Sequence, residues 1–206
     1  MAFRLEEKIE LHISDYLKIL SLIKKNGGKE IYKERKISSL YFDNKNYDMF
    51  LDSEEGTLPR KKIRIRHYPQ EKITSFYFEK KISSVEGKFK SSKLINLVEK
   101  KRYFDQGIFD QYYGQCLKNI RVSYNRKYFK IRNNRITIDS NIYFQSPNGK
   151  LSYLVDKILI VEIKANQPNV KEIFNSEIPY QRSRYSKYCV GINLLYNKNS
   201  FQRLVK

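Results

Sequence analysis

Residues Arg60 to Tyr68 have the sequence RKKIRIRHY, in which charged and apolar residues alternate. Successive side chains of a β-strand point to opposite faces, so this pattern predicts a strand with Ile63 and Ile65 on one face. The other face carries a row of cations and a tyrosine: Arg60, Lys62, Arg64, Arg66 and Tyr68. Cations spaced about 7 Å apart repel each other, so the row requires water, carboxylate partners or a polyanionic ligand.

The composition favours a folded protein with an acidic partner. At 206 residues the chain is long enough for a buried core, and we predict a single domain over residues 1–206. Lys and Arg number 41 against 22 Asp and Glu, a formal net charge of +19. This excess favours nucleic acid, a phosphorylated metabolite, a polyphosphate or an anionic membrane, without distinguishing among them. The 17 Tyr and 12 Phe argue against intrinsic disorder.

Several protein classes are excluded by what the sequence lacks. Cys116 and Cys189 form no CxxC motif, and His12 and His67 are isolated, which argues against a disulfide framework or a zinc site. The N-terminal sequence is charged from Arg4 onward, and no window approaches 18 consecutive apolar residues. We therefore expect a cytoplasmic protein without a signal peptide or a membrane span.

Periodicity predicts further strands and several helices. Period-two alternation predicts strands at residues 3–11, 37–42, 73–82, 120–130, 135–144 and 157–165. Helices are predicted at residues 16–23, ended by a Gly pair, at 44–52, within 94–118 and at 168–174. Residues 84–93, SVEGKFKSSK, resemble a mobile basic loop that is either simply solvated or guards the entrance of a site.

Charged faces recur on several of these strands. Examples are Arg4, Glu6, Lys8 and Glu10 on the first strand, Glu79 and Lys81 on a middle strand, and Glu162 and Lys164 on a late strand. An open sheet exposes such faces to water, whereas a closed barrel turns them inward. We predict an α+β fold, a closed antiparallel β-tunnel of about eight strands with helices packed outside.

Eight short motifs occur in order along the chain. They are Arg4-x-Glu6-x-Lys8, Ser39 to Asp43 (SLYFD), Lys62-x-Arg64-x-Arg66, Glu79-x-Lys81, Tyr124-x-Arg126, Arg135 to Asp139 (RITID), Glu162-Ile-Lys164 and Ser186-Lys187-Tyr188. Together they resemble the polyphosphate polymerase domain of the vacuolar transporter chaperone (VTC) complex, a branch of the triphosphate tunnel metalloenzymes, also called CYTH-like. The resemblance extends from about residue 3 to residue 195.

The resemblance implies a function and a set of site residues. It implies transfer of the γ-phosphoryl group of ATP to a growing inorganic polyphosphate chain, with Mn²⁺ or Mg²⁺ as cofactor. It implies catalytic, phosphate-binding roles for Lys8, Arg64, Arg66, Lys81, Arg126, Lys164 and Lys187. Further substrate-binding positions are Arg4, Lys62, Tyr41, Tyr124 and Ser186. The metal ligands are Glu162 and Glu6, and Glu79 and Asp139 are weaker candidates for orienting cations or metal-bound water.

Two departures from the superfamily pattern favour synthesis over hydrolysis. Hydrolytic members typically have Glu-x-Glu-x-Lys on the first strand, but here Arg4 occupies the first glutamate position. The late strand carries Glu162-x-Lys164 in place of paired carboxylates, which removes metal ligands and adds cations. An inorganic or nucleoside triphosphatase on the same fold remains an alternative, as does a non-enzymatic module that binds polyphosphate or nucleic acid. Nucleic acid is not expected, because the aromatic residues lie mostly on apolar faces and form no stacking platform among the cations.

Each assignment also has a structural alternative. Arg64 and Arg66 are also compatible with a solvated strand face. The apolar neighbours of Glu162 argue against a free surface position, and its structural alternative is an ion pair with a facing cation. For Tyr41 and Tyr124 the simplest role is packing.

Overall fold

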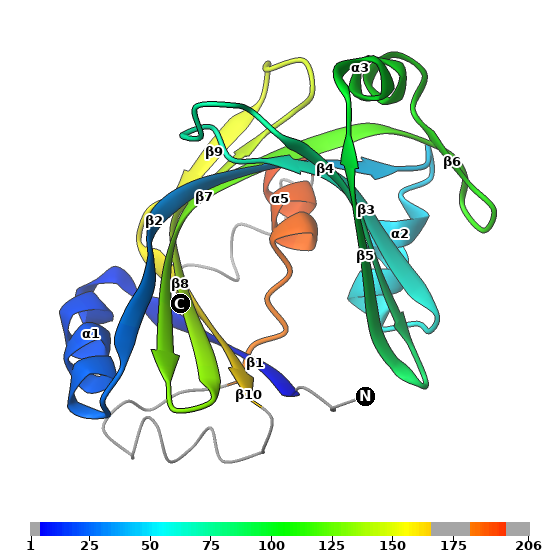
Figure 1. Cartoon of the computed structure of the whole chain (residues 1–206). Coiled ribbons are helices and arrows are strands. Elements are labelled where there is room, and N and C mark those ends of the chain that lie inside the picture. The colour runs from blue at the N-terminus through cyan, green and yellow to red at the C-terminus, as the bar shows by residue number, and fades with distance from the viewer. Residues whose placement is uncertain (1–4, 166–181, 197–206) are drawn as a thin grey trace. The chain divides into compact units, whose positions relative to one another are not determined.

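The computed structural model describes residues 5–165 and 182–196 of the chain. Within these residues, ten mainly antiparallel strands form one sheet, accompanied by four α-helices, which confirms the predicted α+β class (Figure 1). The strand order is β1-β10-β8-β7-β2-β3-β4-β5, with β6 paired to β7 and β9 to β8. No pairing in the described ranges joins β1 to β5, so the sheet is not closed by hydrogen bonds and the closed tunnel stays a prediction.

The bounds of the elements are as follows. The strands are β1 (Leu5–His12), β2 (Lys29–Asp43), β3 (Arg60–His67), β4 (Phe76–Ser84), β5 (Gly87–Ile95), β6 (Ile108–Asp110), β7 (Gly114–Ile131), β8 (Asn134–Gln145), β9 (Ser152–Val155) and β10 (Ile158–Ala165). The helices are α1 (Tyr16–Lys25), α2 (Asp48–Glu55), α3 (Leu97–Gln106) and α5 (Lys187–Tyr196), and a short 3-10 helix, η1 (Ile13–Asp15), precedes α1. No helix in this part of the chain is long and apolar enough to cross a membrane.

The chain packs into two compact units. Unit 1 comprises residues 1–36, 124–142 and 154–185, and unit 2 comprises residues 37–123, 143–153 and 186–206, each as far as it is described. Strands β2, β7, β8 and β9 each contribute one part to each unit. The single domain predicted over residues 1–206 stays a prediction.

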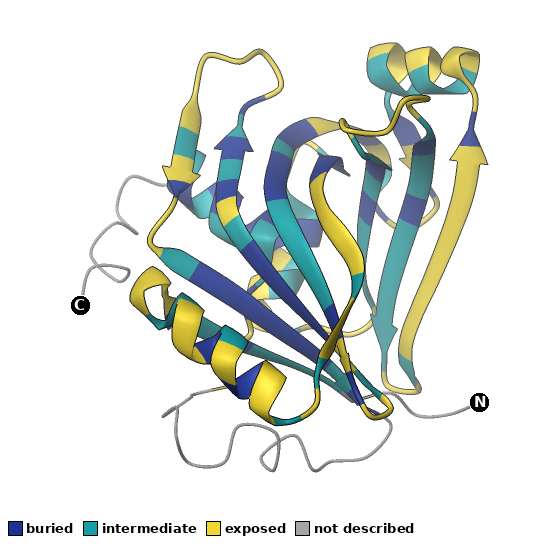
Figure 2. Ribbon diagram, turned by 60° about the vertical axis from the view of Figure 1, so that its left-hand side comes forward, coloured by how far each residue is buried: buried dark blue, intermediate teal, exposed yellow. Residues whose placement is uncertain are grey.

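The core of unit 1 lies between α1 and the apolar face of its strands. Ile9 of β1 lies opposite Val161 of β10, which lies opposite Ile138 of β8. These side chains are buried together with Ile19, Leu22 and Ile23 of α1. Figure 2 shows α1 with buried residues on its inner side and exposed residues on its outer side. The helix ends at the predicted glycine pair, where a Cβ on Gly28 would lie 2.4 Å from Ile23 Cγ2.

The core of unit 2 contains the isoleucines of the RKKIRIRHY stretch. Ile63 and Ile65 of β3 are buried among Leu40, Phe42 and Met49, which confirms the predicted strand and its apolar face. Two-residue periodicity placed these side chains correctly because β3 has neighbours on both sides, β2 and β4, and one covered face.

The prediction of a basic loop at residues 84–93 is wrong. The segment belongs largely to β5, which pairs with β4 from Gly87 opposite Ser84 to Ile95 opposite Phe76. Figure 2 shows that β5 is exposed along almost its whole length. In the pairings described, β5 is an end strand that is stabilised by backbone hydrogen bonds to β4. Its mostly polar sequence lacks the apolar alternation that would have indicated a strand.

Other boundaries also differ from the predictions. β2 begins eight residues earlier than expected, and the segment at residues 94–118 contains one helix followed by β6 and the start of β7. The strand β9 was not predicted. The helix predicted at residues 168–174 lies outside the described residues.

Candidate functional site

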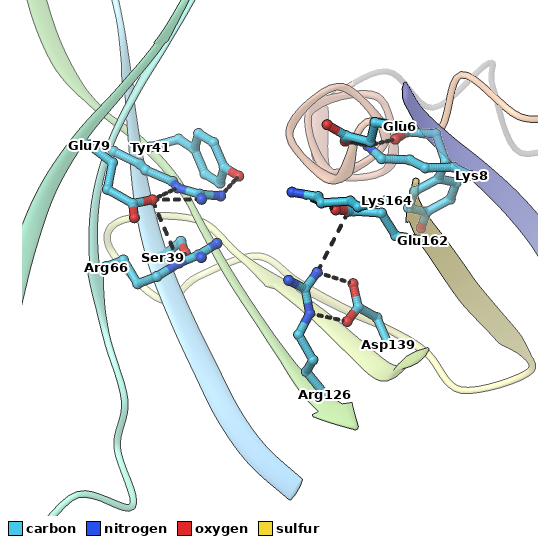
Figure 3. Close-up of polar contacts among 12 residues, drawn as sticks. Glu6, Lys8, Ser39, Tyr41, Arg66, Glu79, Arg126, Asp139, Glu162 and Lys164 are labelled. Carbon is cyan, nitrogen blue, oxygen red and sulfur yellow. Dashed lines mark hydrogen bonds and ion pairs between the residues drawn. The ribbon is translucent and has the colours of Figure 1, made fainter. Parts of the chain in front are cut away.

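A group of polar side chains on β2 to β5 of unit 2 surrounds one carboxylate, and we call it the β3–β4 cluster. It consists of Tyr41, Arg64, Arg66, Glu79 and Lys90 (Figure 3 labels Tyr41, Arg66 and Glu79). Arg64 lies opposite Tyr41 on one side and opposite Glu79 on the other. Its Nε and Nη2 lie 2.7 and 2.6 Å from Glu79 Oε2, and its Nη1 donates to the Tyr41 hydroxyl at 2.8 Å. The strand register therefore fixes the Arg64 guanidinium on both sides.

Two further cations share the Glu79 carboxylate. Arg66 Nε lies 3.9 Å from Glu79 Oε2 and donates to Ser39 Oγ at 3.2 Å, while Lys90 Nζ donates to Glu79 Oε1 at 2.6 Å. Burial alone raises the pKa of Glu79, but Arg64, Arg66 and Lys90 outweigh it and hold the pKa at about 2. Glu79 is therefore ionised and orients three cations on one face of the sheet.

Cations outnumber carboxylates on this face. Lys62 lies opposite Lys81 across β3 and β4, and Lys81 lies opposite Lys90 across β4 and β5. Burial, with Lys81 and Arg60 nearby, lowers the pKa of Lys62. With Arg64 and Arg66, this gives five cations among the described residues of this face, three of which, Arg64, Arg66 and Lys90, pair with Glu79. Such an excess of guanidinium and ammonium groups is suited to a polyanion, since arginine binds phosphate bidentately and lysine acts as a point charge.

Helix α5 supports this face through an aromatic contact. The ring of Tyr41 stacks on Tyr188 with a centroid distance of 5.1 Å and an interplanar angle of 22°. The Tyr188 hydroxyl donates to Asp43 Oδ2 at 2.5 Å, and Asp43 also accepts hydrogen bonds from two backbone amides at the start of α2. In addition, Lys62 Nζ donates to Ser186 Oγ at 2.8 Å, which brings two of the predicted substrate-binding residues together.

A second group, the β1–β10 cluster, lies in unit 1 and consists of Glu6, Lys8, Arg126, Asp139, Glu162 and Lys164 (Figure 3). Glu6 lies opposite Lys164, and Lys8 opposite Glu162, so carboxylates and ammonium groups alternate. Lys164 Nζ is 3.1 Å from Glu162 Oε1, and Lys8 Nζ is 4.0 Å from Glu6 Oε1 and donates to the carbonyl oxygen of Tyr185 at 2.8 Å. The register thus gives each of these carboxylates a cation neighbour.

Arg126 is held by a buried carboxylate within the same cluster. Its Nε and Nη2 donate to the two oxygens of Asp139, which is 0% exposed, at 2.5 and 2.7 Å, and Nη2 is 3.9 Å from Glu162 Oε2. Burial alone lowers the pKa of Arg126, but Asp139 outweighs it and raises the pKa. The guanidinium lies over the ring of Tyr124, which is only 3% exposed. Three cations therefore match three carboxylates in this cluster, in contrast to the excess around Glu79.

The predicted metal ligands, Glu162 and Glu6, both belong to the β1–β10 cluster. Glu162 is 8% exposed and lies close to Lys164, and Glu6 lies near Lys8. Among the residues that the structure describes, no group of three or more His, Cys, Asp or Glu side chains is arranged to hold a metal ion. Glu6 of β1 and Glu162 of β10 lie on paired strands, and their coordination of a divalent ion together with phosphate and water oxygens stays a prediction. They do not form a metal site made of protein ligands alone.

The remaining predicted residues are placed as follows. Arg4 lies outside the described residues, and Lys187 is the first residue of α5 and is half-buried. The sequence assigned no site role to Ser39, Asp43 or Lys90. Lys90 lies on β5 opposite Lys81 of β4, and the mostly polar sequence of β5 gave no signal of this pairing. The chemical roles of all the site residues stay predictions.

Comparisons with known proteins agree with this fold. The model of the VTC domain family matches residues 3–196. The protein bh2851 of Bacillus halodurans, a candidate adenylate cyclase, is 12% identical, with a TM-score of 0.57 over 88% of this chain and 96% of that chain. PH1819 of Pyrococcus horikoshii OT3 is 11% identical, with a TM-score of 0.59 over 92% of this chain and 99% of that chain. No curated protein matches the chain.

The family match covers nearly the whole chain, and the structural similarity extends over most of it. At 11–12% identity, the solved structures establish similarity of fold alone. The motifs on β1, β3, β4 and β10 that resemble the VTC domain all lie on strands of this sheet. The chain therefore belongs to the VTC domain family, and its fold is similar to those of bh2851 and PH1819.

Proposed function

We propose that this protein is a metal-dependent polyphosphate polymerase that transfers the γ-phosphoryl group of ATP to an inorganic polyphosphate chain. Membership of the VTC domain family supports a phosphoryl-transfer enzyme. The observation that carries the proposal is the excess of cations around Glu79 in the β3–β4 cluster. The closed tunnel that the resemblance implies is part of the same proposal.

Arg64 and Arg66 are the proposed phosphate-binding groups. They lie two residues apart on the same face of β3, about 7 Å along the strand, so they suit separate, non-adjacent phosphates of a linear chain. Glu79 and Tyr41 hold the Arg64 guanidinium before any ligand arrives. Because the orientation is established in advance, little side-chain entropy is lost when phosphate binds.

Phosphoryl transfer to a phosphate acceptor makes limited chemical demands on the protein. The acceptor is already an anionic oxygen, so no nucleophilic side chain is needed, and the barrier arises mostly from charge repulsion and alignment. Guanidinium and ammonium groups reduce the repulsion and fix the alignment. Lys62, hydrogen-bonded to Ser186, is proposed as a further point charge beside Arg64.

Glu162 and Glu6 are the proposed ligands of the divalent cofactor, Mn²⁺ or Mg²⁺. When bound, such an ion bridges phosphate oxygens and offsets the charge that develops on the leaving group. In this chain the carboxylates lie beside Lys164 and Lys8, whose ammonium groups orient them.

The proposal is tested by turnover of ATP with Mn²⁺ in the natural chain and in Arg64→Ala, Arg66→Ala and Glu162→Ala variants. We expect formation of ADP and polymer by the natural chain and a loss of about tenfold or more in each variant, because each removes a charge-assisted contact. Lys101→Ala is the matched control, since it removes an exposed lysine of α3 that forms an ion pair with Asp105, a residue outside both clusters. Circular dichroism verifies folding of each variant. Full activity in all three site variants would contradict the site assignment.

A further inference from the structure

Unit 2 contains a cavity on the opposite face of β4 from the β3–β4 cluster. It has a volume of about 390 Å³ and is formed by β4, α3, β6 and the start of β7. Phe78 and Lys80 of β4 line it, and they alternate along the strand with Glu79, which points to the other face. The cavity is therefore separate from the residues that the proposed function uses.

Aromatic rings form much of the cavity wall. Phe78 and Tyr103 stack with a centroid distance of 5.4 Å and an interplanar angle of 24°. Phe109 of β6 also lines the cavity and is 71% exposed, although it is a large apolar side chain. A stacked pair beside an exposed ring offers a surface on which a planar group can pack.

The charged groups at the cavity are cationic. Lys80 Nζ lies 3.5 Å from Asp110 Oδ2, but the same buried carboxylate also accepts a hydrogen bond from Lys61 at 2.8 Å. Two lysines thus share one carboxylate, and Arg102 adds a guanidinium 5.1 Å from the centre of the Tyr103 ring. None of the described residues that line the cavity is acidic.

We propose that this cavity binds a small organic anion that carries an aromatic ring, with a mononucleotide as the first class to test. The volume lies at the lower end of the range for ligand pockets, about 300–1,000 Å³, which suits one ring system and one acidic group. The ring packs on Tyr103 and Phe109, and the anionic group pairs with Arg102 and Lys80. This site goes beyond the proposed polymerase function and does not depend on it.

The experiment is calorimetric titration of the natural chain with AMP, with adenosine and inorganic phosphate as separate arms. We expect AMP to bind more tightly than either part alone, because ring and anion contacts both contribute. Arg102→Gln should weaken AMP binding about tenfold or more. Lys101→Gln, one residue away on the same helix, should leave it within about twofold.

Three results would overturn the proposal. The first is no measurable binding of AMP to the natural chain. The second is phosphate binding as tightly as AMP, which would exclude a role for the aromatic wall. The third is loss of AMP binding in Arg64→Gln with unchanged binding in Arg102→Gln, which would place the nucleotide on the other face. As a second measurement, Phe109→Trp introduces the only tryptophan of the chain, and its fluorescence should change on addition of AMP.

Discussion

Replacing Glu79 with glutamine removes the carboxylate that Arg64, Arg66 and Lys90 share. The pKa of Glu79 is held at about 2, against an ordinary value of 4.5. A pKa lowered by about 2.5 corresponds to about 3.4 kcal/mol of folding stability at neutral pH. Because the side chains of Arg64 and Lys90 are partly exposed, solvent screening reduces this contribution. We therefore expect Glu79→Gln to lower the free energy of unfolding by about 2 kcal/mol.

The measurement is urea-induced unfolding of the natural chain and the variant at several pH values. A carboxylate with a lowered pKa stabilises the fold above its unfolded-state pKa, and this contribution is lost as the pH falls through the folded-state value. The stability difference between natural chain and variant should therefore be constant above about pH 5. Below pH 4.5 it should shrink by at most about 1.4 kcal/mol per pH unit.

The matched control is Glu71→Gln, which removes an exposed glutamate from the loop before β4 and should change stability by less than about 0.5 kcal/mol. Equal stability of Glu79→Gln and the natural chain at neutral pH would refute the reasoning. So would a stability difference that persists undiminished well below pH 4.5, since the effect would then not arise from the charge of Glu79.

Three further predictions concern the two clusters. Arg126→Gln leaves the buried Asp139 carboxylate without its bidentate partner and should lower the free energy of unfolding by about 3–5 kcal/mol, measured by urea denaturation. Tyr188→Phe removes the hydrogen bond to Asp43 but keeps the stack on Tyr41. The free energy of unfolding should therefore fall by about 1–2 kcal/mol, and an unchanged unfolding midpoint would contradict this prediction. Chelation of divalent ions with EDTA should abolish ATP turnover and leave the circular dichroism spectrum unchanged, and turnover that survives chelation would exclude the metal role.

The charged and apolar faces of the strands could be predicted from the sequence because side-chain alternation is a local property. Ile63 and Ile65 are buried as the pattern at Arg60 to Tyr68 predicts. The same alternation placed Arg64 and Arg66 together on the other face. Local periodicity sufficed here because β3 has one covered face and two strand neighbours.

Strand register and long-range pairing could not be predicted from the sequence. The pattern at Gly87 to Ile95 has few apolar residues, so Lys90 was assigned to a loop, although β5 brings it to Glu79. The hydrogen bonds between Arg126 and Asp139 depend on how β7 and β8 pair. The alternative in which Glu162 forms an ion pair has a structural basis, since Lys164 lies 3.1 Å away.

Identification of the products formed from ATP and Mn²⁺ tests the central claim most directly. Phosphorus NMR of the reaction of the natural chain distinguishes terminal and internal phosphates of a polymer from orthophosphate. We predict ADP together with internal-phosphate resonances that disappear on digestion with exopolyphosphatase. Orthophosphate as the only phosphate product besides ADP would contradict polymer synthesis and identify a triphosphatase, and binding of ATP or polyphosphate without turnover would contradict an enzymatic role.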